Sequence, residues 1–331
     1  MRRYFIICLK RQKKAKTLLS KNVNLNFQNF LVYLKNVGGG VVIRWLLAAR
    51  PKTLTAAIVP IVAATALVRA NGYAIHWWVT GLCLFSALCI QVATNFINDA
   101  IDFDKGADTA ERIGPTRVTQ SGLITQKTLY RVSAVLLLLA FFAGVPLVYL
   151  GGWPIVIVGV LSLLMAYSYT GGPMPLAYLG LGDLFVVIFF GLIAVGGVYF
   201  IQTGHYSTSA LVLGLQIGFL STVLIAINNL RDVHQDVKAN KKTLAVRFGI
   251  LFVRTEIVLL IMVSFLLQVY WLREGSLRAA LLPLIFLPFA IRLLRQIAKN
   301  DPSPIYNRYL AQSALLHVGF GLVLSVGLYL K

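Results

Sequence analysis

The chain has 331 residues, a net charge of +20 and a hydrophobic content of 58%, and its mean hydropathy is +0.77. This composition excludes a soluble globular domain and a disordered chain, and it is typical of an integral membrane protein. The positive charge does not indicate nucleic-acid binding, because the basic residues are spread over loops between apolar runs, where membrane orientation and anionic lipid account for them.

The first 44 residues form a basic extension without any acidic residue. Its early apolar run, residues 4–9, is too short for the core of a secretory signal. Apolar residues at helical spacing around position 30 follow a lysine-rich stretch, which predicts a helix lying on the inner leaflet, with disorder as the alternative. We therefore distinguish an interfacial or disordered extension, 1–44, from a transmembrane domain, 45–331.

Nine apolar runs are long enough to cross a membrane as helices, since about 20 residues span the ~30 Å hydrocarbon layer. They lie at 53–70, 77–97, 129–150, 153–169, 180–201, 208–228, 252–272, 277–296 and 309–330. The predicted fold class is all-α: a multi-pass membrane protein with nine transmembrane helices around a central cavity that opens to the cytoplasmic side.

More than half of the eleven acidic residues fall in two short stretches, 95–108 and 228–236, at the ends of the second and sixth runs. Asn and Asp recur there four residues apart: Asn98 and Asp102 in the first stretch, and Asn228, Asp232 and Asp236 in the second. On a helix, each set shares one face. The duplication predicts two half-bundles that face each other across a cavity.

Clustered carboxylates repel one another unless a cation lies between them. Carboxylate and amide oxygens suit Mg²⁺, which usually binds one or two carboxylates together with phosphate oxygens. Nearby basic residues can bind the remaining phosphate charge, Arg through paired hydrogen bonds and Lys as a point charge. The candidates are Arg112, Arg117, Lys127, Arg231, Lys238, Lys241, Lys242 and Arg247. The alternative is a set of solvated loop ends; we favour a magnesium–diphosphate site because the Asn and Asp spacing repeats.

Two other polar residues have two interpretations each. Asp183 opens the fifth run and is either an ordinary helix N-cap or a polar wall of the cavity. Tyr167, like Tyr169, is near the end of the fourth run and is either an interfacial aromatic or a π face that stabilises a reacting cation. Polar side chains within the runs are costly in lipid, so we expect them to face the bundle interior: Gln91, Asn95 and Gln216.

The orientation follows from the distribution of Lys and Arg. If the amino terminus and the loops after every second span are on one side, that side holds 27 of the 31 basic residues. The positive-inside rule then predicts a cytoplasmic amino terminus, cytoplasmic acidic stretches and an external carboxyl terminus.

From about residue 50 to its end, the chain resembles the UbiA superfamily of intramembrane prenyltransferases. The closest likeness is to the 1,4-dihydroxy-2-naphthoate polyprenyltransferases of menaquinone biosynthesis. The resemblance depends on RPKTL (50–54), NDAID with KGAD (98–108), RIGPTRVTQSGLIT (112–125), GLGD (180–183) and NNLRDVHQD with KKTLAVRFG (228–249).

By position, the resemblance implies two metal–diphosphate motifs, in which Asn98, Asp102, Asp232 and Asp236 are central to catalysis. The implied ligands of Mg²⁺ are Asn98, Asp102, Asp108, Asn228, Asp232 and Asp236. Asp99 is adjacent to the first motif. Two positions depart from the family pattern: Gly106 stands where the commoner spacing has an acid, which the naphthoate branch shares, and Asn240 stands where that branch usually has Gly.

The implied reaction transfers a polyprenyl group from polyprenyl diphosphate to 1,4-dihydroxy-2-naphthoate, with loss of diphosphate and CO₂, and gives demethylmenaquinol. The implied enzyme is a Mg²⁺-dependent polyprenyltransferase of the bacterial cytoplasmic (inner) membrane, in contact with membrane lipid. The acceptor-binding candidates are Arg50, Lys52, Tyr167 and Asp183, the first two as partners of the acceptor's carboxylate.

Three alternatives remain open at this point. The nearest is a UbiA-type enzyme with another aromatic acceptor, 4-hydroxybenzoate or haem. A membrane transporter would place ionisable residues near the bilayer midplane on broken helices, whereas these acids end their spans. In a non-catalytic scaffold the repeated Asp spacing would have no use.

Overall fold

A computed structural model describes residues 40–106, 113–114 and 117–331. The chain divides into two compact units, Met1–Leu47 and Ala48–Lys331. Apart from residues 40–44, the predicted extension lies outside the described residues. All of the predicted spans fall in the second unit.

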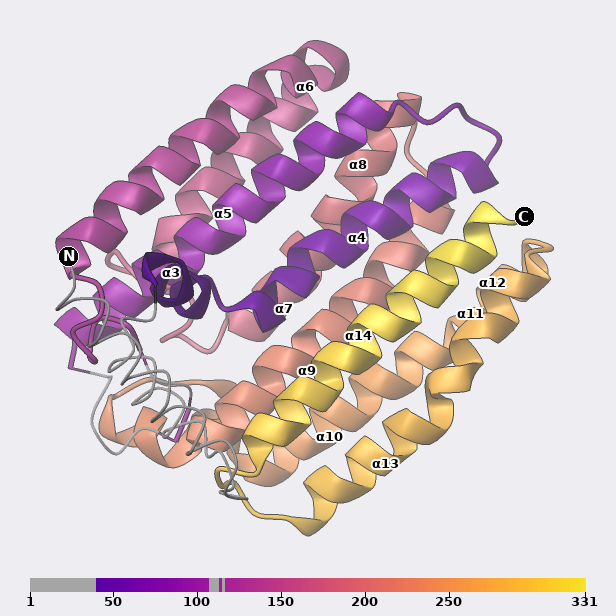
Figure 1. The fold of residues 1–331 in the computed structure, drawn as a ribbon. Coiled ribbons are helices and arrows are strands. Elements are labelled where there is room, and N and C mark those ends of the chain that lie inside the picture. Colours follow the sequence, from indigo (N-terminus) through magenta and orange to yellow (C-terminus); the bar gives the residue numbers. More distant parts are fainter. Residues whose placement is uncertain (1–39, 107–112, 115–116) are drawn as a thin grey trace, which may run out of the picture. The chain divides into compact units, whose positions relative to one another are not determined.

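All regular structure in the described ranges is helical, as predicted (Figure 1). The elements are α3 (Val41–Ala49), α4 (Pro51–Ala70), α5 (Trp77–Asp104), α6 (Gln126–Ser168), α7 (Gly182–Val186), the π-helix η1 (Val187–Ile193), α8 (Ala194–Thr203), α9 (Thr208–Lys238), α10 (Leu244–Leu266), α11 (Gln268–Arg273), α12 (Leu277–Leu281), the 3₁₀ helix η2 (Leu282–Phe286), α13 (Leu287–Lys299) and α14 (Tyr306–Tyr329).

Eight helical segments within the described part of the chain are long and apolar enough to cross a membrane, whereas nine spans are predicted. The difference lies in α6, which takes up two predicted spans, 129–150 and 153–169, in one element of 43 residues. At about 1.5 Å per residue, a straight helix of this length would be roughly twice the ~30 Å hydrocarbon thickness.

The chain reverses direction within α6. Gly152 has φ 60° and ψ −150°, a combination that only glycine adopts at low cost. The start and the end of α6 both meet the carboxyl end of α5: Tyr130 donates to Asp104 over 3.1 Å, and Thr170, just past α6, donates to Asn98. The element is therefore a hairpin of two membrane-length helices.

Helix α9 lies at the centre of the second unit, packed against α4, α8, α10, α14 and η1 (Figure 1). Side chains along its length are at most 1% exposed: Leu213, Ile217, Leu220, Ile227 and Leu230. Because α9 is surrounded by other helices, its polar end is held at a fixed place relative to the ends of its neighbours.

The polar residues within the spans face the bundle interior, as predicted: Gln91, Asn95 and Gln216 are 9%, 3% and 0% exposed. The Asn95 side-chain amide donates to the carbonyl oxygen of Ala49 over 2.9 Å and to the Thr53 hydroxyl over 3.0 Å. This contact fixes the start of α4 against α5.

Candidate active site

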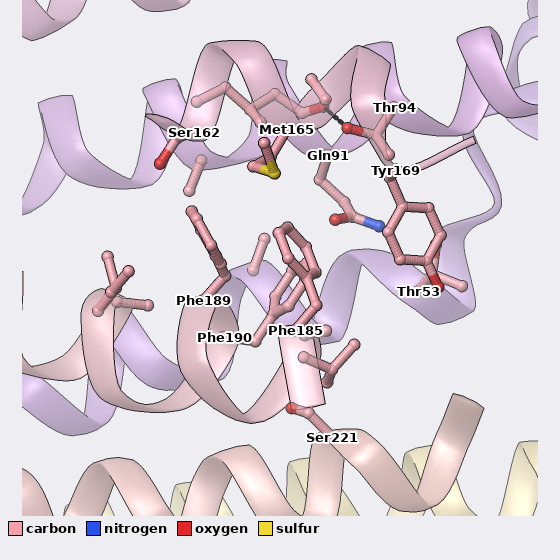
Figure 2. Close-up of a pocket in the computed structure, with 18 of the residues that line it drawn as sticks. Thr53, Gln91, Thr94, Ser162, Met165, Tyr169, Phe185, Phe189, Phe190 and Ser221 are labelled. Carbon is pink, nitrogen blue, oxygen red and sulfur yellow. Dashed lines mark hydrogen bonds between the residues drawn. The ribbon is translucent and has the colours of Figure 1, made fainter. Parts of the chain in front are cut away.

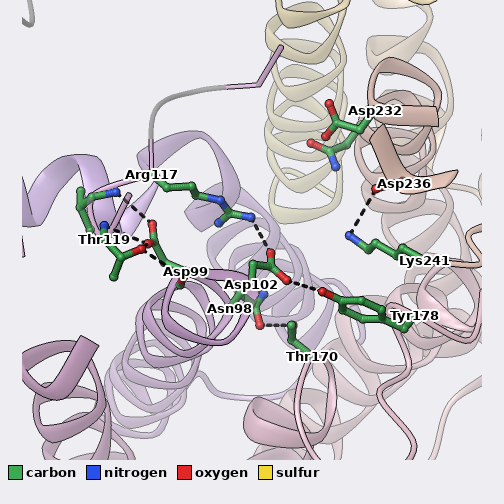
Figure 3. Close-up of polar contacts among 12 residues, drawn as sticks. Asn98, Asp99, Asp102, Arg117, Thr119, Thr170, Tyr178, Asp232, Asp236 and Lys241 are labelled. Carbon is green, nitrogen blue, oxygen red and sulfur yellow. Dashed lines mark hydrogen bonds and ion pairs between the residues drawn. The ribbon is translucent and has the colours of Figure 1, made fainter. Parts of the chain in front are cut away.

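The first motif lies at the carboxyl end of α5 (Figure 3). The Arg117 guanidinium donates to one Asp102 carboxylate oxygen over 2.8 Å, and the Tyr178 hydroxyl donates to the other over 3.0 Å. The amide oxygen of Asn98 accepts a hydrogen bond from the Thr170 hydroxyl. Asp102 is only 6% exposed, so this carboxylate is held by a cation in a largely desolvated place.

Asp99, one residue from Asn98, has a different role. Its carboxylate accepts hydrogen bonds from the backbone amides of Val118 and Thr119, over 3.3 and 3.2 Å, and from the Thr119 hydroxyl. The residue is 2% exposed. Asp99 therefore ties the segment after the first motif to α5 and positions Arg117 beside Asp102 (Figure 3).

The second motif lies at the carboxyl end of α9. Arg231 donates to both carboxylate oxygens of the neighbouring Asp232, over 2.8 and 2.6 Å. The same guanidinium donates to the side-chain oxygens of Asn228 over 2.8 Å and of Asn307, on α14, over 2.9 Å. Arg231, predicted to bind diphosphate, is 1% exposed and in this structure neutralises the second motif.

Asp236 is paired with Lys241, whose ammonium group is 3.9 Å from a carboxylate oxygen. The Tyr178 ring lies beside the same lysine, with the Lys241 nitrogen 5.6 Å from the ring centroid and the Lys105 nitrogen 4.2 Å from it. Tyr178 thus contacts Asp102 of the first motif through its hydroxyl and Lys241 of the second through its ring (Figure 3).

The sequence did not indicate Tyr178, Thr170 or Lys105. Tyr178 and Thr170 lie in the loop between α6 and α7, and Lys105 directly follows α5. They belong to no repeated spacing, so only the tertiary structure places them at the motifs.

A cavity of about 490 Å³ extends from the motifs between α5, α6, η1 and α9. Much of its wall is apolar, with Phe185, Phe189, Phe190 and Met165 around it (Figure 2). The Phe185 and Phe189 rings are stacked with centroids 4.3 Å apart, and the Tyr169 and Phe185 centroids are 5.6 Å apart. The space can enclose a large apolar or aromatic group next to the charged motifs.

The cavity brings together many of the predicted site residues. Those that line it are Arg50, Lys52, Asn98, Asp102, Arg117, Asp183, Asn228 and Lys241. Those that do not line it are Lys127, Tyr167, Arg231, Asp232, Asp236 and Lys242. Asp108 and Arg112 lie outside the described residues. Tyr169, rather than the half-exposed Tyr167, contributes an aromatic ring to the wall.

Asp183 is part of the cavity wall. The N-cap of α7 is Leu181, so the N-cap interpretation of Asp183 is wrong. Asp183 is 4% exposed, and neither of its carboxylate oxygens has a hydrogen-bond partner among the described residues. A buried carboxylate without a partner is unfavourable, which is typical of a residue retained for function.

Two groups near the charges of the motifs have shifted pKa values. Burial raises the pKa of the Tyr169 hydroxyl well above its usual range, and the negative charges of Asp183 and Asp102 add to the effect. The hydroxyl therefore stays protonated. Burial lowers the pKa of the Lys105 ammonium, partly offset by Asp102 and reinforced by the positive charge of Lys241. The Lys105 and Lys241 ammonium groups are thus close enough for their charges to interact.

The donor atoms of both motifs suit a hard divalent cation. Asn98, Asp102, Asn228, Asp232 and Asp236 offer only amide and carboxylate oxygens, which Mg²⁺ prefers. Within the described ranges no three His, Cys, Asp or Glu residues converge as a metal site. The carboxylates are paired instead with Arg117, Arg231 and Lys241. Each of these acids thus already faces a positive charge, and the oxygen donors of both motifs are of the kind that fits magnesium.

An apolar cavity bounded at one end by paired acids and cations defines a class of protein. It is an intramembrane enzyme for a substrate with an apolar tail and an anionic head group. The family model of the UbiA prenyltransferase family matches residues 57–317, which is most of the chain. The chain belongs to this family, as its resemblance implied.

Several of the similar proteins carry the same activity name. A 1,4-dihydroxy-2-naphthoate octaprenyltransferase of Haemophilus influenzae is 40% identical over 62% of this chain and 69% of its own length. The protein of that name from Mycobacterium leprae is 32% identical over 87% of this chain and 96% of its own.

Solved structures share the fold. A UbiA homolog from Archaeoglobus fulgidus bound to DMAPP and Mg²⁺ matches with a TM-score of 0.59 at 16% identity, over 86% of this chain and 99% of its own. The apo structure of a UbiA homolog from Aeropyrum pernix K1 matches with a TM-score of 0.63 at 13% identity, over 83% of this chain and 97% of its own. The chain is thus an integral, multi-pass membrane prenyltransferase.

Proposed function

We propose that this protein transfers a polyprenyl group from polyprenyl diphosphate to 1,4-dihydroxy-2-naphthoate, with release of diphosphate and CO₂, and forms demethylmenaquinol. The observation that carries the proposal is one cavity lined by residues of both motifs, Asn98 and Asp102 from α5 and Asn228 from α9. The name shared by the relatives at 30–40% identity supports the choice of acceptor.

The diphosphate end of the donor lies between the two motifs in this proposal. Oxygens of Asn98, Asp102, Asn228, Asp232 and Asp236 would hold Mg²⁺, and the resemblance adds Asp108, which lies outside the described residues. When bound, the metal would supply Lewis-acid character and neutralise charge on the leaving diphosphate. Arg117 and Lys241 line the cavity and already face carboxylates of the motifs. We expect both to turn partly toward phosphate oxygens, which are stronger partners for a cation than a single carboxylate.

The other described residues predicted to bind phosphate do not line the cavity. Lys127 and Lys242 are exposed and do not line the cavity, so we assign them a steering role through charge alone. Arg231 is committed to Asp232, Asn228 and Asn307. We assign it the positioning of the second motif.

The apolar part of the cavity holds the isoprenoid and keeps water from the allylic cation that forms as diphosphate leaves. The rings of Tyr169 and Phe185 offer π faces to that cation. Arg50 and Lys52 line the cavity at the start of α4 and are the candidate partners of the acceptor's carboxylate. Asp183 completes the polar wall. The acceptor ring bonds to the allylic carbon, and the electron pair of the ring–carboxylate bond returns to the ring as CO₂ leaves.

We further propose that the protein lies in the bacterial cytoplasmic membrane with its amino terminus and both motifs on the cytoplasmic side, so that the cavity opens there. The distribution of 27 of the 31 basic residues supports this orientation. Water-soluble acceptor and diphosphate then meet the lipid-soluble donor at the same membrane face.

The direct test is turnover by the purified protein in lipid, with polyprenyl diphosphate and each of three acceptors: 1,4-dihydroxy-2-naphthoate, 4-hydroxybenzoate and haem. We expect product with the first acceptor only, and no product after EDTA.

Asp102→Asn and Asp232→Asn should each lower turnover by a factor of about 10² or more, the typical effect of removing one such charge-stabilising group. Asp301→Asn, at a 97% exposed side chain, is the matched control and should retain turnover. Product from another acceptor, or full activity of either motif variant, would refute the proposal.

A further inference from the structure

Gln91 continues the motif-bearing face of α5 into the apolar cavity. Gln91, Asn95, Asn98 and Asp102 follow one another at intervals of four, three and four residues, which is the spacing of one helix face. Gln91 lines the cavity and is 9% exposed. Figure 2 shows its amide pointing into the pocket, on the side where the Tyr169 and Phe185 rings lie.

The amide of Gln91 forms no hydrogen bond with the described residues. Both amide atoms of Gln216 and of Gln202, two other buried glutamines, are bonded. Gln268 is buried with unbonded amide atoms but does not line this cavity. Gln91 is therefore the buried glutamine whose free amide faces the space that a substrate would enter.

A free amide in this position favours one kind of occupant. A polar group within a membrane span is unfavourable unless it is bonded, and it commonly marks a functional site. An isoprenoid tail has no hydrogen-bonding group and would leave the amide buried and unpaired, which is unfavourable. A phenolic hydroxyl satisfies it, because an amide both donates and accepts. The chemistry around Gln91 therefore fits an aromatic ring with a hydroxyl group.

The distance along α5 also fits a substituted ring. Asn95 holds the start of α4 through Ala49 and Thr53, which places the Arg50 and Lys52 backbone at the level of Asn95. Gln91 is one turn deeper, about 6 Å at 1.5 Å per residue. An aromatic acid that places its carboxylate near Arg50 and Lys52 can therefore reach Gln91 with a hydroxyl across the ring.

We infer that the side-chain amide of Gln91 hydrogen bonds the acceptor's ring hydroxyl that is not adjacent to the carboxylate, and that this contact selects hydroxylated acceptors. The adjacent hydroxyl can bond the acceptor's own carboxylate, so the distant one needs a partner in the protein. The inference rests on the proposed function and adds a specificity residue to it. The rings of Tyr169 and Phe185 line the same part of the cavity (Figure 2) and give the acceptor ring an aromatic surface to pack against.

The test uses the purified full chain in lipid with Mg²⁺ and polyprenyl diphosphate. Gln91→Leu removes the amide and nearly keeps the volume. The matched control is Thr94→Val, because Thr94 also lines the cavity from α5 but its hydroxyl is already bonded to the carbonyl oxygen of Ile90 over 2.8 Å. For each protein, steady-state rates would give the KM for the dihydroxynaphthoate acceptor and the KM for polyprenyl diphosphate. Inhibition by 1-hydroxy-2-naphthoate, which lacks the distant hydroxyl, would be measured alongside.

We expect Gln91→Leu to raise the acceptor KM by roughly 5- to 50-fold, the effect of losing one buried hydrogen bond. The KM for polyprenyl diphosphate should stay within about twofold. The wild type should bind 1-hydroxy-2-naphthoate more weakly than the dihydroxy acid, and this preference should disappear in Gln91→Leu but persist in Thr94→Val. The inference would be overturned if Gln91→Leu still preferred the dihydroxy acid to 1-hydroxy-2-naphthoate, or if only the KM for polyprenyl diphosphate rose. Either result would leave the proposed function intact. Absence of turnover by the wild type would overturn the proposed function and the inference with it.

Discussion

Tyr178 connects the two motifs at the scale of single residues. Its hydroxyl donates to Asp102, and Lys105 and Lys241 lie beside its ring. A hydrogen bond to a charged group contributes about 1.5–3 kcal/mol, and a cation–π contact about 0.5–2 kcal/mol. The two halves of this side chain can therefore be separated by substitution.

Tyr178→Phe should lower turnover about tenfold at limiting polyprenyl diphosphate, because Asp102 loses a donor that fixes its direction. Tyr178→Leu should lower it several-fold further, because the ring contact with both lysines is lost as well. Steady-state rates over a range of diphosphate concentrations provide the measurement. Equal rates for the Phe and Leu variants would exclude a role for the ring.

The sequence predicted the side chains on helix faces and missed those in loops. The four-residue spacing predicts that Asn98 and Asp102 point together, and both line the cavity. Asp99, one residue from Asn98, lies off that face, and its carboxylate bonds the backbone amides of Val118 and Thr119. Spacing within one helix carries no information about which loop crosses its end, so Tyr178 and Thr170 could not be predicted.

At the scale of elements, the span of residues 180–201 differs most from its prediction. An uninterrupted helix was expected, whereas the structure has α7, the π-helix η1 and α8. Gly191 of η1 packs against Gly214 and Gly218 of α9. The absence of side chains there lets the two backbones approach closely, and this places Phe185, Phe189 and Phe190 on the cavity side (Figure 2). Hydropathy alone cannot distinguish a π-helix from an α-helix.

Gly191→Ala should destabilise the protein by about 1–3 kcal/mol, the usual effect of overpacking. An added Cβ would lie 2.4 Å from the Gly214 carbonyl oxygen and 2.8 Å from the Gly218 Cα, which are backbone atoms that cannot rotate away. Gly196→Ala is the control in the following helix, since nothing lies within 4 Å of its added Cβ, and it should be neutral or slightly stabilising. Thermal unfolding in detergent would compare the three proteins, and an unchanged Gly191→Ala midpoint would contradict this account of the contact.

At the scale of the whole molecule, the site depends on motifs that are 130 residues apart in the sequence. Hydropathy predicted the helices, and the internal duplication predicted that the motifs face each other. The sequence pattern could not predict which cations pair with the carboxylates of the motifs. Arg117, in the loop after α5, pairs with Asp102 on α5. Arg231 pairs with its neighbour Asp232 and also donates to Asn307 on α14. The contacts of Arg117 with Asp102 and of Arg231 with Asn307 follow from no local pattern.

The arrangement predicts that pyrophosphate and Mg²⁺ together stabilise the protein, because both motifs bind one ligand in the folded state only. At a ligand concentration about a hundredfold above Kd, the gain is about 2.7 kcal/mol, which thermal unfolding of the protein in detergent can detect. Pyrophosphate alone should stabilise the protein little, since the acids of both motifs repel it without the metal. Asp102→Asn and Asp232→Asn should each abolish most of the shift, and the double variant should lose no more than either one, as expected for two groups that act on one ligand. If each single variant lost only part of the shift and the losses added, the motifs would bind separate ions, and the shared site that both the fold and the proposed reaction require would be excluded.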